Sequence, residues 1–174
     1  MTSPLVNFHK HDKPNDDRLT LERIHTFDFQ DLEDIHTYIQ WIFPLDEPSR
    51  AIPWSPVLTQ DDINELRGDV QVQARLYKSL CLMCRFYGFN VLGIDNDRIE
   101  IKIDMDEFQE RYANWISPYN HNYLRLTRIL KSLRLLGCED WADQLYNVLE
   151  QVYNLYPKII SKTTFEFWQN AVGK

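Results

Sequence analysis

Apolar residues recur along most of the chain at steps of three and four, which is the spacing of one face of an amphipathic helix. Two helix starts carry capping signals. Asp28 is an N-cap candidate with Asp31 three residues on, and Thr59 opens a second helix between the flanking apolar pair Leu58 and Ile63. Helix ends are expected at the glycines that follow periodic segments, namely Gly68, Gly88 and Gly137.

The helix that begins at Asp28 carries a histidine on its apolar face. His36 is spaced at helical steps from its apolar neighbours, so its imidazole is expected to point toward the core, with Gln40 one turn further on. Those neighbours are Leu32, Ile35, Ile39 and Phe43. A core histidine that satisfies a nearby carbonyl and a ligand-contacting histidine both fit this position.

Longer helices follow in the middle and C-terminal parts of the chain. A helix over residues 69–87 is predicted from the recurrence of Val70, Ala74, Tyr77, Cys81 and Cys84. Four more are predicted over residues 104–115, 120–136, 140–156 and 163–171. Strand alternation occurs at Ile99, Ile101 and Ile103, after the turn residues 95–97, and residues 89–94 supply a partner strand.

These elements predict an all-α fold. We expect one compact bundle of about six to eight helices with at most one short β-hairpin. Residues 44–56 contain four prolines among apolar residues, which predicts an ordered, packed loop. The whole chain, residues 1–174, is expected to be one domain, and its polar residues 1–17 are expected to form an extended N-terminal segment.

The charge balance bears on the partners that the chain can bind. It has 19 Lys and Arg against 26 Asp and Glu, a formal charge of -7, which repels phosphate backbones and disfavours nucleic acid. No stretch reads as a signal peptide or a membrane span, and three cysteines fit a reducing compartment. We therefore expect a cytoplasmic protein.

Known catalytic and metal-binding signatures are absent from the sequence. There is no nucleophile elbow, zincin motif, dinucleotide fingerprint or Walker loop. Cys81 and Cys84 form a C-x-x-C within a helical stripe, without a second pair, and are interpreted as core thiols. His9, His11 and His25 lie among polar residues and are expected to be solvated. We expect no catalytic residue, metal or cofactor.

Residues 120–134 combine an apolar face with arginines and lysine at steps of three. The face is Leu126, Ile129, Leu130 and Leu133, and the basic residues are Arg125, Arg128, Lys131 and Arg134. A phosphate groove is one interpretation. The other is that Leu124 and Leu135 bury part of the basic side, so that some arginines pair with carboxylates. Tyr38 and Trp41, with Trp54 of the proline-rich loop, are candidates for an aromatic binding surface.

Two ordered blocks resemble the conserved region of the opioid growth factor receptor family. The first is His36-Thr37-Tyr38-Ile39-Gln40-Trp41-Ile42-Phe43-Pro44-Leu45, with Pro56 to Thr59 after it. The second runs from Tyr87-Gly88 through Arg111 to Trp115 and His121 to Leu130. The resemblance implies a non-enzymatic helical module whose animal members are described as nuclear-envelope-associated receptors for opioid peptides. This chain resembles a stand-alone microbial member.

We accordingly expect a peptide- or protein-binding module in which the two blocks fold together and form a ligand site. The candidate residues are His36, Tyr38, Gln40, Trp41, His121, Asn122, Arg125 and Arg128. One alternative is a small enzyme or anion-binding protein that uses Arg125 and Arg128 with His36 or His121. Another is a purely structural or oligomerisation domain. The sequence leaves the ligand and the oligomeric state open.

Overall fold

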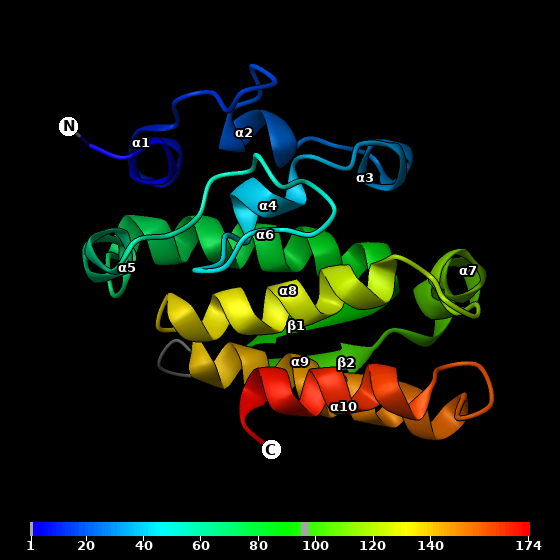
Figure 1. Ribbon diagram of the computed structural model, residues 1–174. Coiled ribbons are helices and arrows are strands. Elements are labelled where there is room, and N and C mark those ends of the chain that lie inside the picture. Colours follow the sequence, from blue (N-terminus) through cyan, green and yellow to red (C-terminus); the bar gives the residue numbers. More distant parts are fainter. Residues whose placement is uncertain (1, 95–97) are drawn as a thin grey trace. The chain divides into compact units, whose positions relative to one another are not determined.

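The structure, a computed structural model, describes residues 2–94 and 98–174 and is mostly helical (Figure 1). Within those residues it holds ten helices and one two-stranded antiparallel sheet, which confirms the all-α fold with a short hairpin. The chain forms two compact units. The first comprises Met1–Leu80 and Leu135–Gly137, and the second comprises Cys81–Arg134 and Cys138–Lys174.

The first unit is built from short helices whose starts are fixed by side-chain caps. At Asp28 and Thr59 the cap is reciprocal, because Asp31 and Asp62 accept from the N–H group of the capping residue, and both predicted starts are confirmed. The helices of this unit are α1 (Pro4–His11), α2 (Leu21–Ile24), α3 (Phe29–Asp34), α4 (Ile39–Ile42), α5 (Gln60–Leu66) and the part of α6 (Val70–Tyr87) that ends at Leu80.

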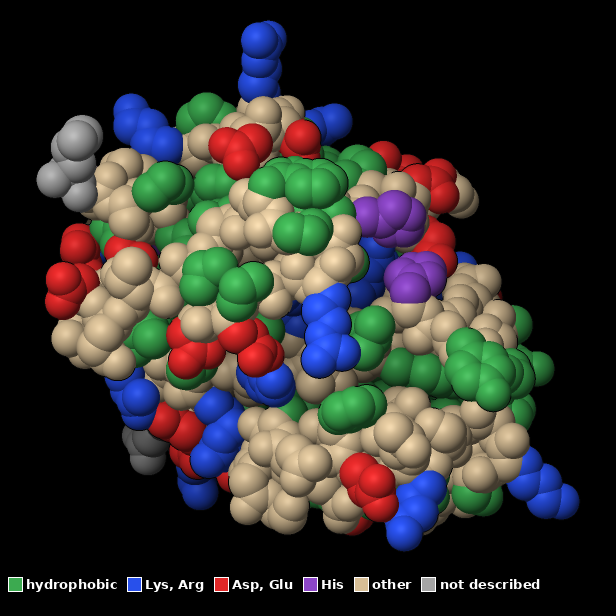
Figure 2. Space-filling view, in the orientation of Figure 1, with side chains coloured by type: hydrophobic (Ala, Val, Ile, Leu, Met, Phe, Trp, Pro, Cys, Tyr) green, Lys and Arg blue, Asp and Glu red, His purple; other side chains and the backbone are tan. Residues whose placement is uncertain are grey.

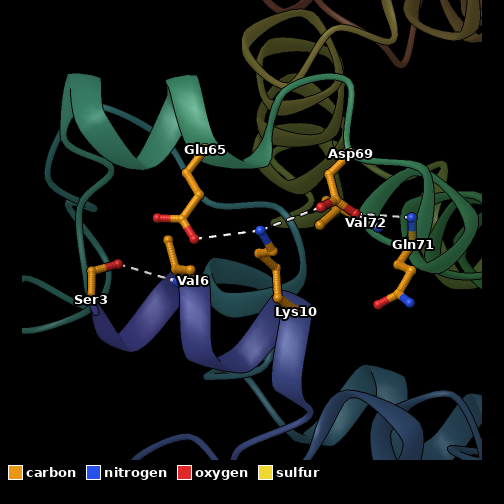
Figure 3. Close-up of polar contacts among 7 residues, drawn as sticks. All are labelled: Ser3, Val6, Lys10, Glu65, Asp69, Gln71 and Val72. Carbon is orange, nitrogen blue, oxygen red and sulfur yellow. Dashed lines mark hydrogen bonds and ion pairs between the residues drawn. The ribbon is translucent and has the colours of Figure 1, made fainter. Parts of the chain in front are cut away.

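Residues 4–11 are helical, which corrects the expectation of an extended segment over residues 1–17. α1 starts with Pro4, whose missing N–H has no intrahelical role at that position. Ser3 Oγ accepts a hydrogen bond from Val6 N at 3.2 Å (Figure 3). The polar composition concealed a short apolar face, through which α1 packs against α4 and α5. The buried residues of α1 are Leu5, Val6, Phe8 and His9.

Lys10 links α1 to the end of α5 and the start of α6. Its Nζ lies 3.4 Å from Glu65 Oε1 and 3.3 Å from Asp69 Oδ2 (Figure 3). Asp69 also caps α6, because its Oδ1 accepts from Gln71 N at 2.9 Å and from Val72 N at 3.1 Å. One carboxylate therefore fixes both the helix start and the position of α1 beside it.

The helix predicted from Asp28 breaks, and His36 does not point into the core. α3 ends at Asp34, and Ile35 takes an extended ψ of 123°. Side chains then satisfy the released carbonyls. The Tyr38 hydroxyl donates to Leu32 O at 3.0 Å, and the Gln40 amide nitrogen faces the carbonyls of Thr37 and His36 at 3.0 Å each. His36 lies exposed in the connection between α3 and α4.

The loop between α4 and α5 is ordered, as its prolines predicted. Leu58 N donates to Leu45 O at 2.8 Å across its base, and Ser49 Oγ accepts from Ile52 N at 3.2 Å. Its buried residues include Pro44, Leu45, Ser49 and Ser55. The tip of the loop is exposed, and it includes Trp54, whose side chain is 74% exposed.

The second unit contains the hairpin and the longer helices. β1 (Phe89–Gly93) pairs with β2 (Ile99–Ile103) so that Phe89 lies opposite Ile103. The turn predicted at residues 95–97 lies outside the described residues. α9 packs against both β2 and α10. Besides α6 from Cys81, the helices of this unit are α7 (Met105–Trp115), α8 (Asn122–Leu135, in this unit as far as Arg134), α9 (Glu139–Leu155) and α10 (Lys162–Val172).

The α8 helix largely follows the sequence prediction. Asn120 Oδ1 accepts from Asn122 N at 2.9 Å at its start, as expected of a cap. The predicted apolar face is buried, and its residues are Leu126, Ile129, Leu130 and Leu133. Leu124, by contrast, was expected to be covered and is 67% exposed. It lies in the first turn of the helix, where a single apolar residue on the surface is common.

An aromatic core forms where α6 turns into β1. Gly88 has a φ of +82°, and a Cβ atom there would lie 2.5 Å from Phe108 Cα, so only glycine allows α7 to approach this closely. Trp115 Nε1 donates to Tyr87 O at 3.2 Å, and Phe89 stacks on Phe108 with ring centroids 6.2 Å apart. This core fixes the position of α7 against the start of β1.

Candidate functional site

In the first unit, the sequence-predicted site residues other than His36 lie in the core. Tyr38, Gln40 and Trp41 are buried, so Tyr38 and Trp41 do not form the expected aromatic surface. Trp41 packs against Phe8 with ring centroids 5.3 Å apart, and its carbonyl accepts a hydrogen bond from His9. These residues stabilise the junction of α1 and α4, and His36 is the exposed member of the set.

In the second unit, the predicted site residues at the start of α8 also divide into buried and accessible ones. Asn122 and Arg125 are buried, and Arg125 Nη1 donates to Asn122 Oδ1 at 3.4 Å. The same oxygen accepts from the Tyr87 hydroxyl at 3.3 Å. A buried guanidinium held in this way serves packing, whereas His121 is exposed and Arg128 is half-buried. The proposed union of the two sets in one pocket stays a prediction, because each set belongs to a different unit.

An open apolar groove of about 560 Å³ lies within the second unit. Four residues of α7 line it, spaced at i, i+3, i+4 and i+7, so that they share one helical face. α9 ends just before Pro157, and its last residues complete the wall. The lining residues are Ile103, Met105, Phe108, Gln109, Tyr112, Leu155 and Tyr156.

The groove has an aromatic lining and exposed apolar edges. Tyr156 stacks on Tyr112 with an interplanar angle of 13°, and its ring centroid lies 6.3 Å from that of Phe108. Phe108 is buried, whereas Leu155 is 62% exposed and Tyr112 is 40% exposed. The polar groups of the lining are one amide and two phenols, so the groove is suited to binding apolar side chains rather than to acid or base chemistry.

Sequence analysis missed this groove although α7 itself was predicted. Met105, Phe108 and Tyr112 have the spacing of a core face, and that spacing does not distinguish a helix face covered by the chain from one left open. A usable signal was the proline that stops α9 directly after the apolar pair Leu155-Tyr156.

Exposed hydrophobic side chains also occur outside the groove. In Figure 2, they gather over the loop between α4 and α5, where Trp54 and Val57 are exposed. Over α10, they lie beside charged side chains of both signs, and Lys162 and Glu166 form an ion pair there at 3.4 Å.

Two histidines expected to be solvated are buried or half-buried in the first unit. His9 Nε2 lies 2.8 Å from Trp41 O, and burial lowers the pKa of His9 to about 4. His25 Nε2 lies 2.8 Å from Ser79 Oγ, and burial also lowers the pKa of His25. His11 is exposed, as expected.

The His25–Ser79 contact has the first requirement of a nucleophilic pair but not the others. Ser79 is 1% exposed, so its hydroxyl is closed to substrate. Within the described part of the chain, His25 Nδ1 has no hydrogen-bond partner that would orient the ring. The contact satisfies the buried Ser79 hydroxyl and the half-buried His25 ring.

The thiols are placed for packing. Cys84 is buried in α6, and burial raises the pKa of its thiol well above the usual value. Cys81 is half-buried one turn earlier on the same helix. Among residues 2–94 and 98–174, no group of three or more His, Cys, Asp or Glu side chains could hold a metal ion. None of the helices in those ranges is both long and apolar enough to cross a bilayer.

Comparison with known proteins identifies the family of the chain. Residues 6–174 match the family described as the opioid growth factor receptor (OGFr) conserved region. The opioid growth factor receptor of Rattus norvegicus is 38% identical over 115 residues, which cover 66% of this chain and 19% of that protein. Opioid growth factor receptor-like protein 1 of Mus musculus is 31% identical over 145 residues, 83% of this chain and 29% of that protein.

A third relative extends the comparison beyond mammals. Opioid growth factor receptor-like protein 1 of Xenopus tropicalis is 34% identical over 145 residues, which cover 83% of this chain and 26% of that protein. The chain thus spans less than a third of each of these curated relatives. No solved structure matches it.

Proposed function

The chain belongs to the family defined by the opioid growth factor receptor conserved region, and from that premise we propose that it is a non-enzymatic module that binds a peptide or protein segment. The observation that carries the proposal is the groove between α7 and the end of α9. A segment of a partner lays two or three apolar side chains into it, and the stacked rings of Tyr112 and Tyr156 form one wall.

The dimensions and chemistry of the groove support this assignment. Met105 and Tyr112 are seven residues apart on α7, a span of about 10 Å at 1.5 Å per residue, which accommodates two turns of a helical segment. Its volume of about 560 Å³ falls in the range of sites that bury several side chains or a small ligand. Apolar walls with few polar groups are typical of helix-in-groove recognition.

The proposal includes the receptor role that the relatives' names state. The animal proteins are named opioid growth factor receptors, and the shared region is where this chain resembles them. An opioid peptide is therefore one ligand to test. We also propose a cytoplasmic location, which agrees with the three free cysteines Cys81, Cys84 and Cys138. Fractionation of cells that express the chain checks that location.

The binding proposal is tested with a displayed library of random peptides selected against the whole chain, followed by fluorescence anisotropy of the selected peptides. Leu155→Asp places a charge in the groove wall, and we expect it to weaken binding by at least tenfold. Leu124→Asp is the matched control, because Leu124 is also a helical leucine and is 67% exposed, compared with 62% for Leu155, but lies outside the groove.

The outcomes separate the remaining alternatives. Selected peptides that bind the Leu155→Asp and Leu124→Asp variants equally well would overturn the groove assignment. Loss of binding in Trp54→Ser instead would move the site to the loop between α4 and α5. A dimer in light scattering that Leu155→Asp dissociates would favour the oligomerisation alternative.

A further inference from the structure

We propose that the chain self-associates through the open edge of β1, which pairs antiparallel with β1 of a second copy and joins the two hairpins into one four-stranded sheet. The surface uses none of the residues that line the α7–α9 groove. It is therefore independent of the proposed function, and a dimer formed in this way would carry two grooves.

The register of the hairpin determines which backbone groups of β1 point away from β2. At the base of the hairpin, Asp104 N donates to Gly88 O at 3.0 Å. Hydrogen-bonded and non-hydrogen-bonded pairs alternate along an antiparallel ladder, so the even-numbered residues of β1 bond to β2. The N–H and C=O groups of Val91 and Gly93 therefore face the outer edge.

This outer edge of β1 is open, whereas β2 packs against α9. Within residues 2–94 and 98–174, the outward groups of Val91 and Gly93 have no hydrogen-bond partner. Asn90, Leu92 and Gly93 are exposed, and no atom lies within 4 Å of the Cβ position of Gly93. Unpaired backbone groups on an accessible strand are a template for pairing with a further strand.

β1 lacks the features with which many edge strands resist such pairing. Its sequence Phe-Asn-Val-Leu-Gly contains no charged residue and no proline. The charged residues of the two strands are Glu100 and Lys102 of β2, and they pair with each other at 2.9 Å. An antiparallel neighbour of β1 with the same sequence therefore brings no like charges face to face.

A second copy is the occupant because β1 is complementary to itself. In the register that overlaps all five residues, Val91 lies opposite Val91 of the copy, and Phe89 lies opposite Gly93 of the copy. A β-branched pair and an aromatic residue across from a glycine both stabilise antiparallel pairing. Leu92, which is 39% exposed, comes diagonally close to Leu92 of the copy on the outer face. Pairing thus covers apolar surface that the monomer leaves in water.

The association should be weak and should strengthen with salt. Five residues on each side make a small interface, so we expect a dissociation constant on the order of 100 µM. Each copy carries a formal charge of -7, and added salt screens the repulsion between the copies. Sedimentation of the whole chain should therefore show monomers at about 10 µM and mainly dimers at about 1 mM.

The first test blocks the edge without touching the hairpin. Val91→Pro removes an outward N–H group, and proline is tolerated in an edge strand where that group would face solvent. We expect dimerisation to weaken at least tenfold. Val91→Thr is the matched control, because it keeps the N–H group and the branched side chain, and it should dimerise like the unsubstituted chain. Leu155→Asp, in the groove wall, should also leave the dimer intact.

The second test reads the register and does not depend on the proline variant. Asn90 lies opposite Leu92 of the copy in a non-hydrogen-bonded pair, where Cα atoms about 4.5 Å apart are within reach of a disulfide. A mixture of Asn90→Cys and Leu92→Cys chains, under mild oxidation, should form several times more disulfide-linked dimer than either variant alone. The single variants control for the native cysteines.

Three results would overturn the proposal. The first is a monomer at about 1 mM for the unsubstituted chain. The second is equal dimerisation of Val91→Pro and Val91→Thr, or a dimer that Leu155→Asp dissociates. The third is no gain in cross-linked dimer from mixing the two cysteine variants. None of these results bears on peptide binding, which the library selection tests separately.

Discussion

His9 lies in the core of the first unit and keeps its ring neutral. The Trp41 carbonyl can only accept, so His9 Nε2 carries the hydrogen, and Nδ1 has no hydrogen-bond partner among the described residues. Protonation of Nδ1 would place a buried charge near Arg75, which itself donates to His9 O. The sequence did not reveal that His9 is buried. A histidine between Phe8 and Lys10 is expected to be solvated unless α1 is known to pack against the core.

We expect acid to destabilise the fold through His9. Its pKa is about 4 when folded and 6.5 in the unfolded chain, so the unfolded state binds the proton first as the pH falls. Stability is full above pH 6.5 and declines by about 3 kcal/mol toward pH 4, with His25 adding to the loss. Urea unfolding across this range measures it.

The variant His9→Gln separates this histidine from other titrating groups. A glutamine amide can still donate to Trp41 O, and the decline with acid should be visibly shallower. His11→Gln alters an exposed ring and should leave the decline unchanged. A wild-type slope in His9→Gln would contradict the assignment.

Gly88 offers a second test at the scale of one residue. Gly88→Ala combines a positive φ with a Cβ that meets the Phe108 backbone, so we expect a loss of about 2–4 kcal/mol in the free energy of unfolding. Gly93→Ala is the control, because no atom lies within 4 Å of its Cβ position, and its cost should be below about 1 kcal/mol. Similar losses in both variants would refute a specific close approach at Gly88.

At the scale of elements, local signals were sufficient wherever the deciding atoms are close in sequence. The reciprocal caps at Asp28 and Thr59 are of this kind, and both were predicted. The break after Asp34 was not predicted, because it depends on which side chains satisfy the freed carbonyls. In α6 the helix was predicted, but Val70 and Ala74 are exposed, while Val72 and Leu76 are buried. Apolar residues on several sides of a helix leave the buried side undetermined.

The cap of α5 can be tested directly. Thr59 Oγ1 accepts from Asp62 N at 3.1 Å, so Thr59→Ala should lower the free energy of unfolding by about 1 kcal/mol. Thr59→Ser keeps the hydroxyl and should retain most of the stability that the cap contributes. Thr163→Ala provides the comparison, since Thr163 lies exposed inside α10 rather than at its cap. Equal midpoints for Thr59→Ala and Thr59→Ser in urea titrations would rule out a capping contribution.

At the scale of the whole molecule, the path of the chain was beyond prediction. Residues 135–137 belong to the first unit although both flanking segments belong to the second, and no local pattern marks them. A Cβ at Gly137 would lie 2.9 Å from Arg67 Cγ, a contact between residues seventy positions apart. The same limit applies to the candidate site, because sequence blocks identify a family without stating which of their side chains reach the surface.

We expect the two units to unfold together. The unit boundary falls after Leu80, inside α6, and that helix is continuous from Val70 to Tyr87. Losing one unit alone would leave half of a helix without its packing, which favours a single cooperative transition. Hydrogen exchange followed by mass spectrometry should give α5 and α9 the same opening free energy under conditions near the midpoint. Clearly separate values would indicate independent units.

The burial of α1 has a practical consequence for the choice of fragment ends. A recombinant fragment that starts at Val6 would lack the Ser3 oxygen that holds the Val6 N–H, together with Pro4 and the buried Leu5. Its first turn would fray and uncover Phe8 and His9. Truncation trials, crystallisation fragments and tag cleavage sites are therefore best placed ahead of Ser3.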